Sequence, residues 1–215
     1  EKNGIKIVTV QHHHAHIASV MAEYSLNHCI GVAFDGTGYG TDGTVWGGEF
    51  LRCRGAKYEC MSHIEPVVLA GGDSAARDAK QTAECIKIAA GIESTNETLK
   101  AAIENNIGTY ISTSIGRVFD AVAALLGIKT ENTYEGECAI ALENAAASTK
   151  TSYDMPAMDD PKEIITEVIK AAGDRVDVRE IARGFHDSLV KLIVGKCMII
   201  RDSTAERNVA LSGGV

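Results

Sequence analysis

The amino-acid sequence predicts an α/β fold in which a largely helical block separates two parts of a sheet. The first observation is a set of short apolar runs, typical of buried strands, near the start of the chain and again near its end. The second is an almost unbroken helical pattern over residues 74–204. The third is that the apolar runs at 30–34 and 208–211 both continue into glycine-rich turns. We therefore expect two related strand-to-loop units that hold one phosphate-bearing ligand between them.

The first 65 residues have the pattern β-α-β-β-β. Apolar residues at helical spacing indicate a helix over about residues 14–26. The predicted strands cover residues 5–10, 30–34, 45–53 and 57–64, and a loop over 35–43 joins the second of them to the third.

The helical block follows. Its predicted helices cover residues 75–91, 97–105, 115–127, 135–150, 161–172 and 178–202. The last helix carries an apolar stripe that includes Phe185, Leu189 and Leu192, as expected for a helix packed on a core. The strand at 208–211 then returns the chain to the sheet.

Composition narrows the classes of protein that remain possible. The 215 residues, 45% hydrophobic and 23% charged, suffice for a sizeable core. The formal net charge of −8 argues against a general nucleic-acid-binding surface. No apolar run reaches the roughly 18–20 residues that a membrane helix needs. Six cysteines without a CxxC pair favour reduced thiols in a cytoplasmic protein. We therefore expect neither membrane nor nucleic acid as a partner.

Four of the seven histidines lie within residues 12–16. If this segment is helical, His12 and His16 project from one face about 5–6 Å apart. Neutral imidazole is a common metal ligand, so this pair is a candidate for binding an ion. His13 and His14 point elsewhere on such a helix. The competing interpretation is a histidine-rich helix start that only caps the helix and packs.

Asp35 lies where the strand 30–34 enters its glycine-rich loop. A carboxylate beside glycines suits a metal ion or a metal-bound phosphate, although an Asp-Gly turn that closes a hairpin is the simpler alternative. Together with His12 and His16, it forms an incomplete ligand set for Fe(II) or Zn(II).

Asp120 interrupts an otherwise apolar helix. An unpaired buried carboxylate is costly, so the side chain needs a partner. Arg117, Arg77 and the hydroxyl groups of a ribose are the candidates. We find no Ser-His-Asp or Cys-His arrangement for covalent catalysis.

The motifs along the chain resemble those of a known family. In order, they read QHHHAH, FDGTGYGTDGTVWGGEF, GGD, GRVFDAVAALLG, YEGE and LSGGV. This order is similar to that in the Kae1-like domain of the HypF carbamoyltransferases, over nearly the whole chain. The resemblance implies the fold of actin, Hsp70 and the sugar kinases, with two duplicated lobes around a nucleotide cleft and a large helical insertion. It also divides the chain into a first α/β lobe at 1–73, a mainly helical segment at 74–204 and the start of a second lobe at 205–215.

The resemblance implies a reaction as well. In this family, a YrdC-like domain makes carbamoyl-adenylate from carbamoyl phosphate and ATP. The Kae1-like domain then transfers the carbamoyl group to the C-terminal cysteine of HypE, during synthesis of the cyanide ligands of nickel–iron hydrogenase. The implied cofactors are a divalent Fe or Zn ion and the bound adenylate, with Mg accompanying ATP.

The family's functional residues carry over by motif. His12, His16 and Asp35 match its metal ligands. The matches to its nucleotide and phosphate contacts are Gly36, Thr37, Gly38, Asp120, Gly136, Gly213 and Gly214. The remaining metal ligand and an adenine-contacting Asn would follow Val215, in the rest of the second lobe. We therefore expect the chain alone to be a weak or inactive carbamoyltransferase.

Other interpretations stay open. An O-carbamoyltransferase of the nodulation or antibiotic type and a tRNA-modifying relative share the domain more distantly. A noncatalytic module that binds a metal or a nucleotide belongs to a different functional class. Loss of bound Fe or Zn in His12→Ala and His16→Ala would support the metal site.

Overall fold

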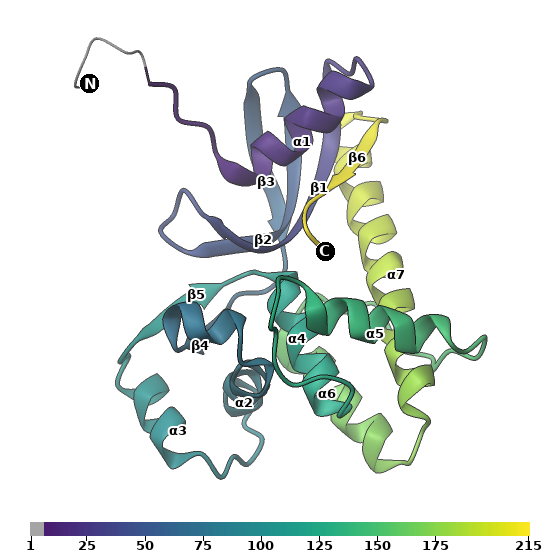
Figure 1. Ribbon diagram of the computed structural model, residues 1–215. Coiled ribbons are helices and arrows are strands. Elements are labelled where there is room, and N and C mark those ends of the chain that lie inside the picture. The colour runs from purple at the N-terminus through teal and green to yellow at the C-terminus, as the bar shows by residue number, and fades with distance from the viewer. Residues whose placement is uncertain (1–6) are drawn as a thin grey trace.

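A computed structural model describes residues 7–215 of the chain (Figure 1). The strands are β1 (His28–Tyr39), β2 (Val45–Arg54), β3 (Lys57–His63), β4 (Val67–Ala70), β5 (Thr109–Ser112) and β6 (Val209–Ser212). The helices are α1 (His12–Glu23), α2 (Ala79–Ala89), α3 (Glu97–Glu104), α4 (Ile115–Leu125), α5 (Glu137–Ala147), α6 (Pro161–Gly173) and α7 (Val178–Thr204), with a short 3-10 helix at Gly72–Ala76. The α/β class predicted from the sequence is confirmed.

All six strands belong to one mixed sheet. Its order is β4-β5-β2-β1-β6, and β3 pairs with the remaining part of β2. β1 runs antiparallel to β2 and parallel to β6, and Ala33 pairs with Ser212 near the ends of the parallel strands. The glycine turn after β6 and the glycine-rich residues that follow the apolar part of β1 therefore lie side by side in one sheet. The three-part division of the chain, with a second lobe beginning at residue 205, stays a prediction.

Successive side chains of β1 point to opposite faces of the sheet, and each face is covered by a different set of helices. Cys29 and Ala33 belong to a small core beneath α1, whereas Ile30 and Phe34 belong to the large core that the helices α2–α7 share. In Figure 1, α1 lies with β1, β2 and β3 in the upper part of the view, and α2–α6 are grouped in the lower part. The long helix α7 extends from the lower group up along the side of the molecule. Asp35 continues the first series, so its side chain points toward α1.

The predictions for the strands need three corrections. A strand was expected over residues 5–10, but residues 7–10 form no strand, and residues 5–6 lie outside the described part of the chain. The loop over 35–43 begins later, because residues 35–39 continue β1 through a register break between Phe34 and Gly38. The short strands β4 and β5 were not predicted, since four residues give too little alternation to recognise.

The helix predicted over 75–91 also starts later. A 3-10 helix occupies its first part, and α2 begins at Ala79 because the Asp78 side chain accepts a hydrogen bond from Gln81 N. The other predicted helices are observed with shifts of up to about three residues at their ends. All six cysteines are unpaired. Among residues 7–215, no helix is both long and apolar enough to cross a membrane.

Candidate functional site

The helix α1 presents its histidines on two sides. Gln11 caps the helix, since its side-chain oxygen accepts a hydrogen bond from His14 N at 2.8 Å. The helix therefore begins at His12, two residues earlier than predicted. His13 is fully buried against the sheet, whereas the side chains of His12 and His16 keep 48% and 32% of their surface exposed. His14 is buried and stacks on Tyr58 with ring centroids 4.9 Å apart.

His12, His16 and Asp35 come together where α1 meets β1 at its register break. His12 Nε2 lies 2.8 Å from Asp35 Oδ2, and His16 Nε2 lies 3.4 Å from the same oxygen. The two Nε2 atoms are 3.2 Å apart. Corners of a tetrahedron with metal–ligand bonds of about 2.0–2.1 Å would be roughly 3.3 Å apart. The three donor atoms therefore fit a single transition-metal ion.

The electrostatics of this triad also favour a cation. Asp35 is 5% exposed, and burial alone would raise its pKa. Hydrogen bonds from His12 and from Gly36 N outweigh burial, so the pKa lies below its ordinary value and the side chain is a carboxylate. The carboxylate of Asp35 and the two imidazole nitrogens converge within 3.4 Å, so a cation could take the place of the proton that His12 donates to Asp35. A bound cation stabilises such an arrangement.

The turn that follows β6 touches β1 beside Asp35. Gly213 has φ +133°, and a Cβ atom there would lie 1.7 Å from Phe34 O. Only glycine fits this backbone and this contact. A Cβ on Gly214 would lie 2.9 Å from Asp35 Oδ1. The glycine turn thus lies directly against the predicted metal ligand on β1.

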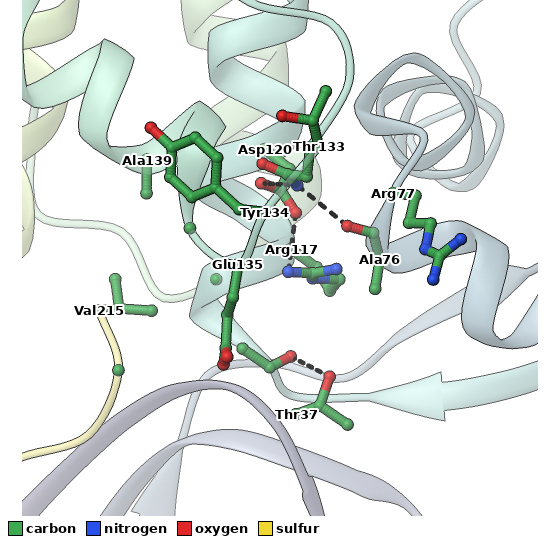
Figure 2. A pocket seen from close by; sticks show the side chains of 15 residues that line it. Thr37, Ala76, Arg77, Arg117, Asp120, Thr133, Tyr134, Glu135, Ala139 and Val215 are labelled. Carbon is green, nitrogen blue, oxygen red and sulfur yellow. Dashed lines mark hydrogen bonds and ion pairs between the residues drawn. The ribbon is translucent and has the colours of Figure 1, made fainter.

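The residue after Asp35, Gly36, belongs to the lining of a pocket of about 310 Å³. Figure 2 shows the residues that line this pocket. Among the predicted phosphate and nucleoside contacts, its lining includes Gly36, Thr37, Asp120, Gly136 and Gly214. Gly38 and Gly213 are not among the lining residues. Gly38 instead lies beside the histidines, where a Cβ would meet His13 Cε1 at 2.3 Å. The register break leaves residues 35–37 out of the β1–β2 ladder, so their backbone can face the pocket.

Asp120 is held at the base of the pocket. Arg117 Nη2 lies 2.9 Å from its Oδ2, which selects one of the two arginines predicted as partners. Burial raises the pKa of Asp120, against the opposing effects of Arg117 and of the hydrogen bond from Asn132. Arg117 is 8% exposed, and its Nε and Nη1 have no hydrogen-bond partner among residues 7–215. Figure 2 shows Arg117 between Asp120 and Thr37, and Arg77 farther to the side.

Asn132 was missed by the sequence analysis, although it fixes the pocket wall. Its Nδ2 donates to Asp120 Oδ1 at 2.9 Å and to Ala76 O at 3.0 Å, and its Oδ1 accepts from Cys138 N at 2.8 Å. These bonds join α4, α5 and the 3-10 helix. Glu137 adds to this, because its Oε2 accepts from Thr133 N at 2.7 Å. No local motif distinguishes Asn132 from an ordinary loop residue.

Ser114 connects the pocket to the triad. It caps α4, and its Oγ lies 3.0 Å from Asp35 O and 2.7 Å from Gly36 O. The helix that carries Arg117 and Asp120 is thereby fixed to the strand end that carries Asp35. The arrangement can hold a cation on one side of residues 35–36 and a polar ligand on the other.

Comparison with known proteins assigns the chain to a family. The family described as "Carbamoyltransferase, Kae1-like Domain, second subdomain" matches residues 31–215, and the "HypF Kae1-like domain" matches residues 1–23. The chain belongs to the HypF carbamoyltransferase family. A HypF homologue of Cupriavidus necator is 34% identical over 98% of this chain and 60% of its own length. HypF of Synechocystis sp. is 32% identical over 100% of this chain and 32% of its own length.

Solved HypF structures have the same fold. A crystal structure of full-length HypF in the phosphate- and nucleotide-bound form superposes with a TM-score of 0.90 at 34% identity, over 98% of this chain and 36% of that one. HypF of T. kodakarensis gives a TM-score of 0.87 at 31% identity, over 99% and 31% of the two chains. The chain thus spans 60% or less of the length of these HypF relatives.

Proposed function

We propose that the chain is the carbamoyl-transferring part of a HypF enzyme and acts in the maturation of nickel–iron hydrogenase. The observation that carries the proposal is the adjacency of two sites. Asp35 completes the candidate metal triad, and the next residue, Gly36, lines the pocket. A phosphate beside Gly36 and Thr37 would therefore lie next to the ion. A nucleotide ester activated for group transfer is the kind of ligand that this pair of sites suits.

The proposed ion is divalent Fe or Zn. Its ligands would be His12, His16 and Asp35, whose donor atoms converge within 2.8–3.4 Å of one another. When bound, such an ion supplies Lewis acidity toward phosphate or carbamoyl oxygens. Three protein ligands leave at least one position for substrate or for a further ligand.

The proposed substrate is carbamoyl-adenylate, with Mg accompanying the ATP from which it is made. Gly36, Thr37 and Gly214 would contact the phosphate by backbone. Asp120 would accept hydrogen bonds from the ribose, since each carboxylate oxygen can accept more than the single contact that it makes here. Gly136 would lie against the nucleoside. The assignments of Gly38 and Gly213 rest on their motifs, because both lie outside the pocket lining.

The proposed acceptor is the C-terminal cysteine of a HypE-like protein. Its thiolate sulfur would attack the carbamoyl carbon, forming a C–S bond while the bond from that carbon to the phosphate oxygen breaks and AMP leaves. A YrdC-like domain would supply the adenylate from carbamoyl phosphate and ATP. The reaction belongs to the cytoplasm in this proposal, and the two-lobed nucleotide cleft of the actin-like fold would enclose it.

The test uses a full-length HypF polypeptide that carries this chain together with the rest of the Kae1-like domain and a YrdC-like domain. It is incubated with carbamoyl phosphate, ATP and a HypE-like acceptor, and the acceptor is analysed by mass spectrometry. We expect a thiocarbamate on the C-terminal cysteine, and none with Asp120→Ala, which removes the ribose contact. An unmodified acceptor in the presence of adenylate formation would contradict the proposal. Carbamoylation of a hydroxyl substrate would favour the O-carbamoyltransferase alternative.

A further inference from the structure

Glu49 is a fully buried carboxyl group that the proposed reaction does not use. It lies on β2, where its Oε1 accepts a hydrogen bond from Thr113 Oγ1 at 2.5 Å and its Oε2 accepts one from Gly48 N at 2.9 Å. The same Oε2 lies 3.7 Å from His13 Nε2. Burying a carboxyl group costs free energy unless its hydrogen bonds compensate for the lost hydration, so the position of Glu49 calls for an explanation.

The tautomer of His13 follows from its neighbour Gln11. The Gln11 Oε1 atom accepts from His14 N, so the other side-chain atom is the amide nitrogen. That nitrogen lies 3.1 Å from His13 Nδ1 and can only donate, so Nδ1 accepts. A neutral His13 therefore carries its proton on Nε2, the atom that faces Glu49. Apart from Glu49, no polar partner of Nε2 is found among residues 7–215.

His13 also contributes to how α1 lies on the sheet. It is one of four buried residues of α1 and directly follows His12, and successive helical residues are rotated by about 100°. Its ring packs against Gly38 so closely that a Cβ there would meet both His13 and His12, the second at 2.8 Å. A small rotation or shift of His13 would therefore move His12 relative to Asp35.

On its other side, Glu49 contacts the segment that fixes Asp35. Thr113 directly precedes Ser114, whose hydroxyl lies within hydrogen-bond distance of the carbonyl oxygens of Asp35 and Gly36. Glu49 thus lies between the helix that provides two candidate ligands and the segment that holds the third. Its Oε2 faces His13 on the helix, and its Oε1 faces Thr113 in the segment that precedes Ser114.

We propose that Glu49 is a positioning residue for a divalent transition-metal site, which it serves by setting His13 and Thr113 so that His12 and His16 face Asp35. This inference rests on the proposed metal triad. Glu49 itself touches neither ion nor substrate. Outer-shell partners of this kind typically change metal affinity by about 10–100-fold when they are altered.

The variant Glu49→Gln tests the inference. The amide oxygen of Gln can still accept from Thr113, but its NH₂ group would face the Gly48 N–H and the protonated Nε2 of His13. We expect the affinity for Zn²⁺, measured by competition with a chromophoric chelator, to fall by about 10–100-fold. We also expect the visible absorption spectrum of the Co²⁺-substituted protein to change, because the spectrum reports ligand geometry.

The matched control is Glu206→Gln. Glu206 is a similarly buried carboxyl near the opposite end of β1, where it binds Arg54 and His28. Its replacement costs stability but leaves the Zn²⁺ affinity and the Co²⁺ spectrum unchanged. If Glu49→Gln does not fold, Thr113→Val removes the donor to Glu49 with little change in volume, and a smaller loss of affinity in the same direction is expected.

The outcomes separate the inference from the proposed function. A folded Glu49→Gln or Thr113→Val protein with the affinity and Co²⁺ spectrum of the unaltered protein would overturn the positioning role, provided that His12→Ala abolishes binding. Undiminished Zn²⁺ binding in both His12→Ala and His16→Ala would instead refute the metal triad itself. Equal losses in Glu49→Gln and Glu206→Gln would show a general effect of buried carboxyls and also refute the positioning role.

Discussion

The candidate metal triad and the proposed nucleotide pocket are neighbours built in opposite ways. The triad takes two side chains from one helix and one from the adjacent strand, and His12 keeps nearly half of its surface exposed. The pocket is organised around Asp120 and Asn132, both buried, with partners contributed by residues far apart in the sequence. The pocket therefore holds its own shape by hydrogen bonds. The triad places two imidazole nitrogens against one carboxylate and depends more on what binds there.

This difference predicts that the two sites respond differently to substitution. Changes in His12 or His16 should remove metal while leaving the fold nearly unaffected, because partly exposed side chains contribute little to stability. Changes in the pocket should lower stability as well as nucleotide affinity, because they leave buried polar groups without partners. The following experiments test this contrast.

The largest expected effect is the loss of metal in His12→Ala. Removing one of three ligands should lower the Zn²⁺ affinity by at least about 100-fold. The free energy of unfolding in the presence of a chelator should change by less than about 0.5 kcal/mol. Metal analysis of the purified protein and urea unfolding measure the two quantities. His186→Ala, a change in a half-buried histidine on α7, is the control and should retain the metal. A large loss of stability in chelated His12→Ala would contradict the contrast.

A smaller loss, this time of stability, is expected for Asn132→Ala. The substitution leaves Asp120 Oδ1, Ala76 O and Cys138 N without their side-chain partner. Buried groups of this kind cost about 1–3 kcal/mol each when water cannot replace the partner, so we expect a loss of about 3 kcal/mol by urea unfolding. Asn105→Ala, which removes only an exposed bond to Ala101 O, is the control. A metal affinity that fell along with stability would show that the two sites are not separable.

Two glycines give a matched pair with smaller effects. Gly136 has φ +76° but open space around its Cβ position, so Gly136→Ala should cost about 1 kcal/mol of backbone strain without changing the metal affinity. Gly38→Ala would push a methyl group into His13 and His12. It should lower the Zn²⁺ affinity, because the histidines must move. Equal metal affinities in the two variants would show that α1 tolerates the displacement.

The sequence predicted these two sites unequally for the same reason. The pair His12–His16 depends only on helical periodicity, and Asp35 follows from a strand end, so local patterns suffice. The role of Asn132 arises from contacts with Ala76, Asp120 and Cys138, which only the folded chain brings together. The fold shows the same division. Long helices were predicted closely, whereas β4 and β5 exist because they pair with one another and no local signal marks them.

In the unaltered protein, the smallest net effect is the pH dependence of stability that Glu49 and His13 produce together. Burial raises the pKa of Glu49 from 4.5 to about 7, so the folded protein binds more protons than the unfolded chain in this window and stability falls as pH rises. Burial, aided by the nearby His12, lowers the pKa of His13 from 6.5 to about 4, so its contribution to stability rises with pH over that range. Between pH 4.5 and 6.5 the two contributions oppose one another in the unaltered protein.

In Glu49→Gln only the His13 contribution remains, and stability should rise with pH by up to about 1.4 kcal/mol per unit relative to the unaltered protein. Urea unfolding at a series of pH values in chelator measures the difference, and identical pH profiles for the two proteins would show that Glu49 does not bind a proton in the folded state within this range.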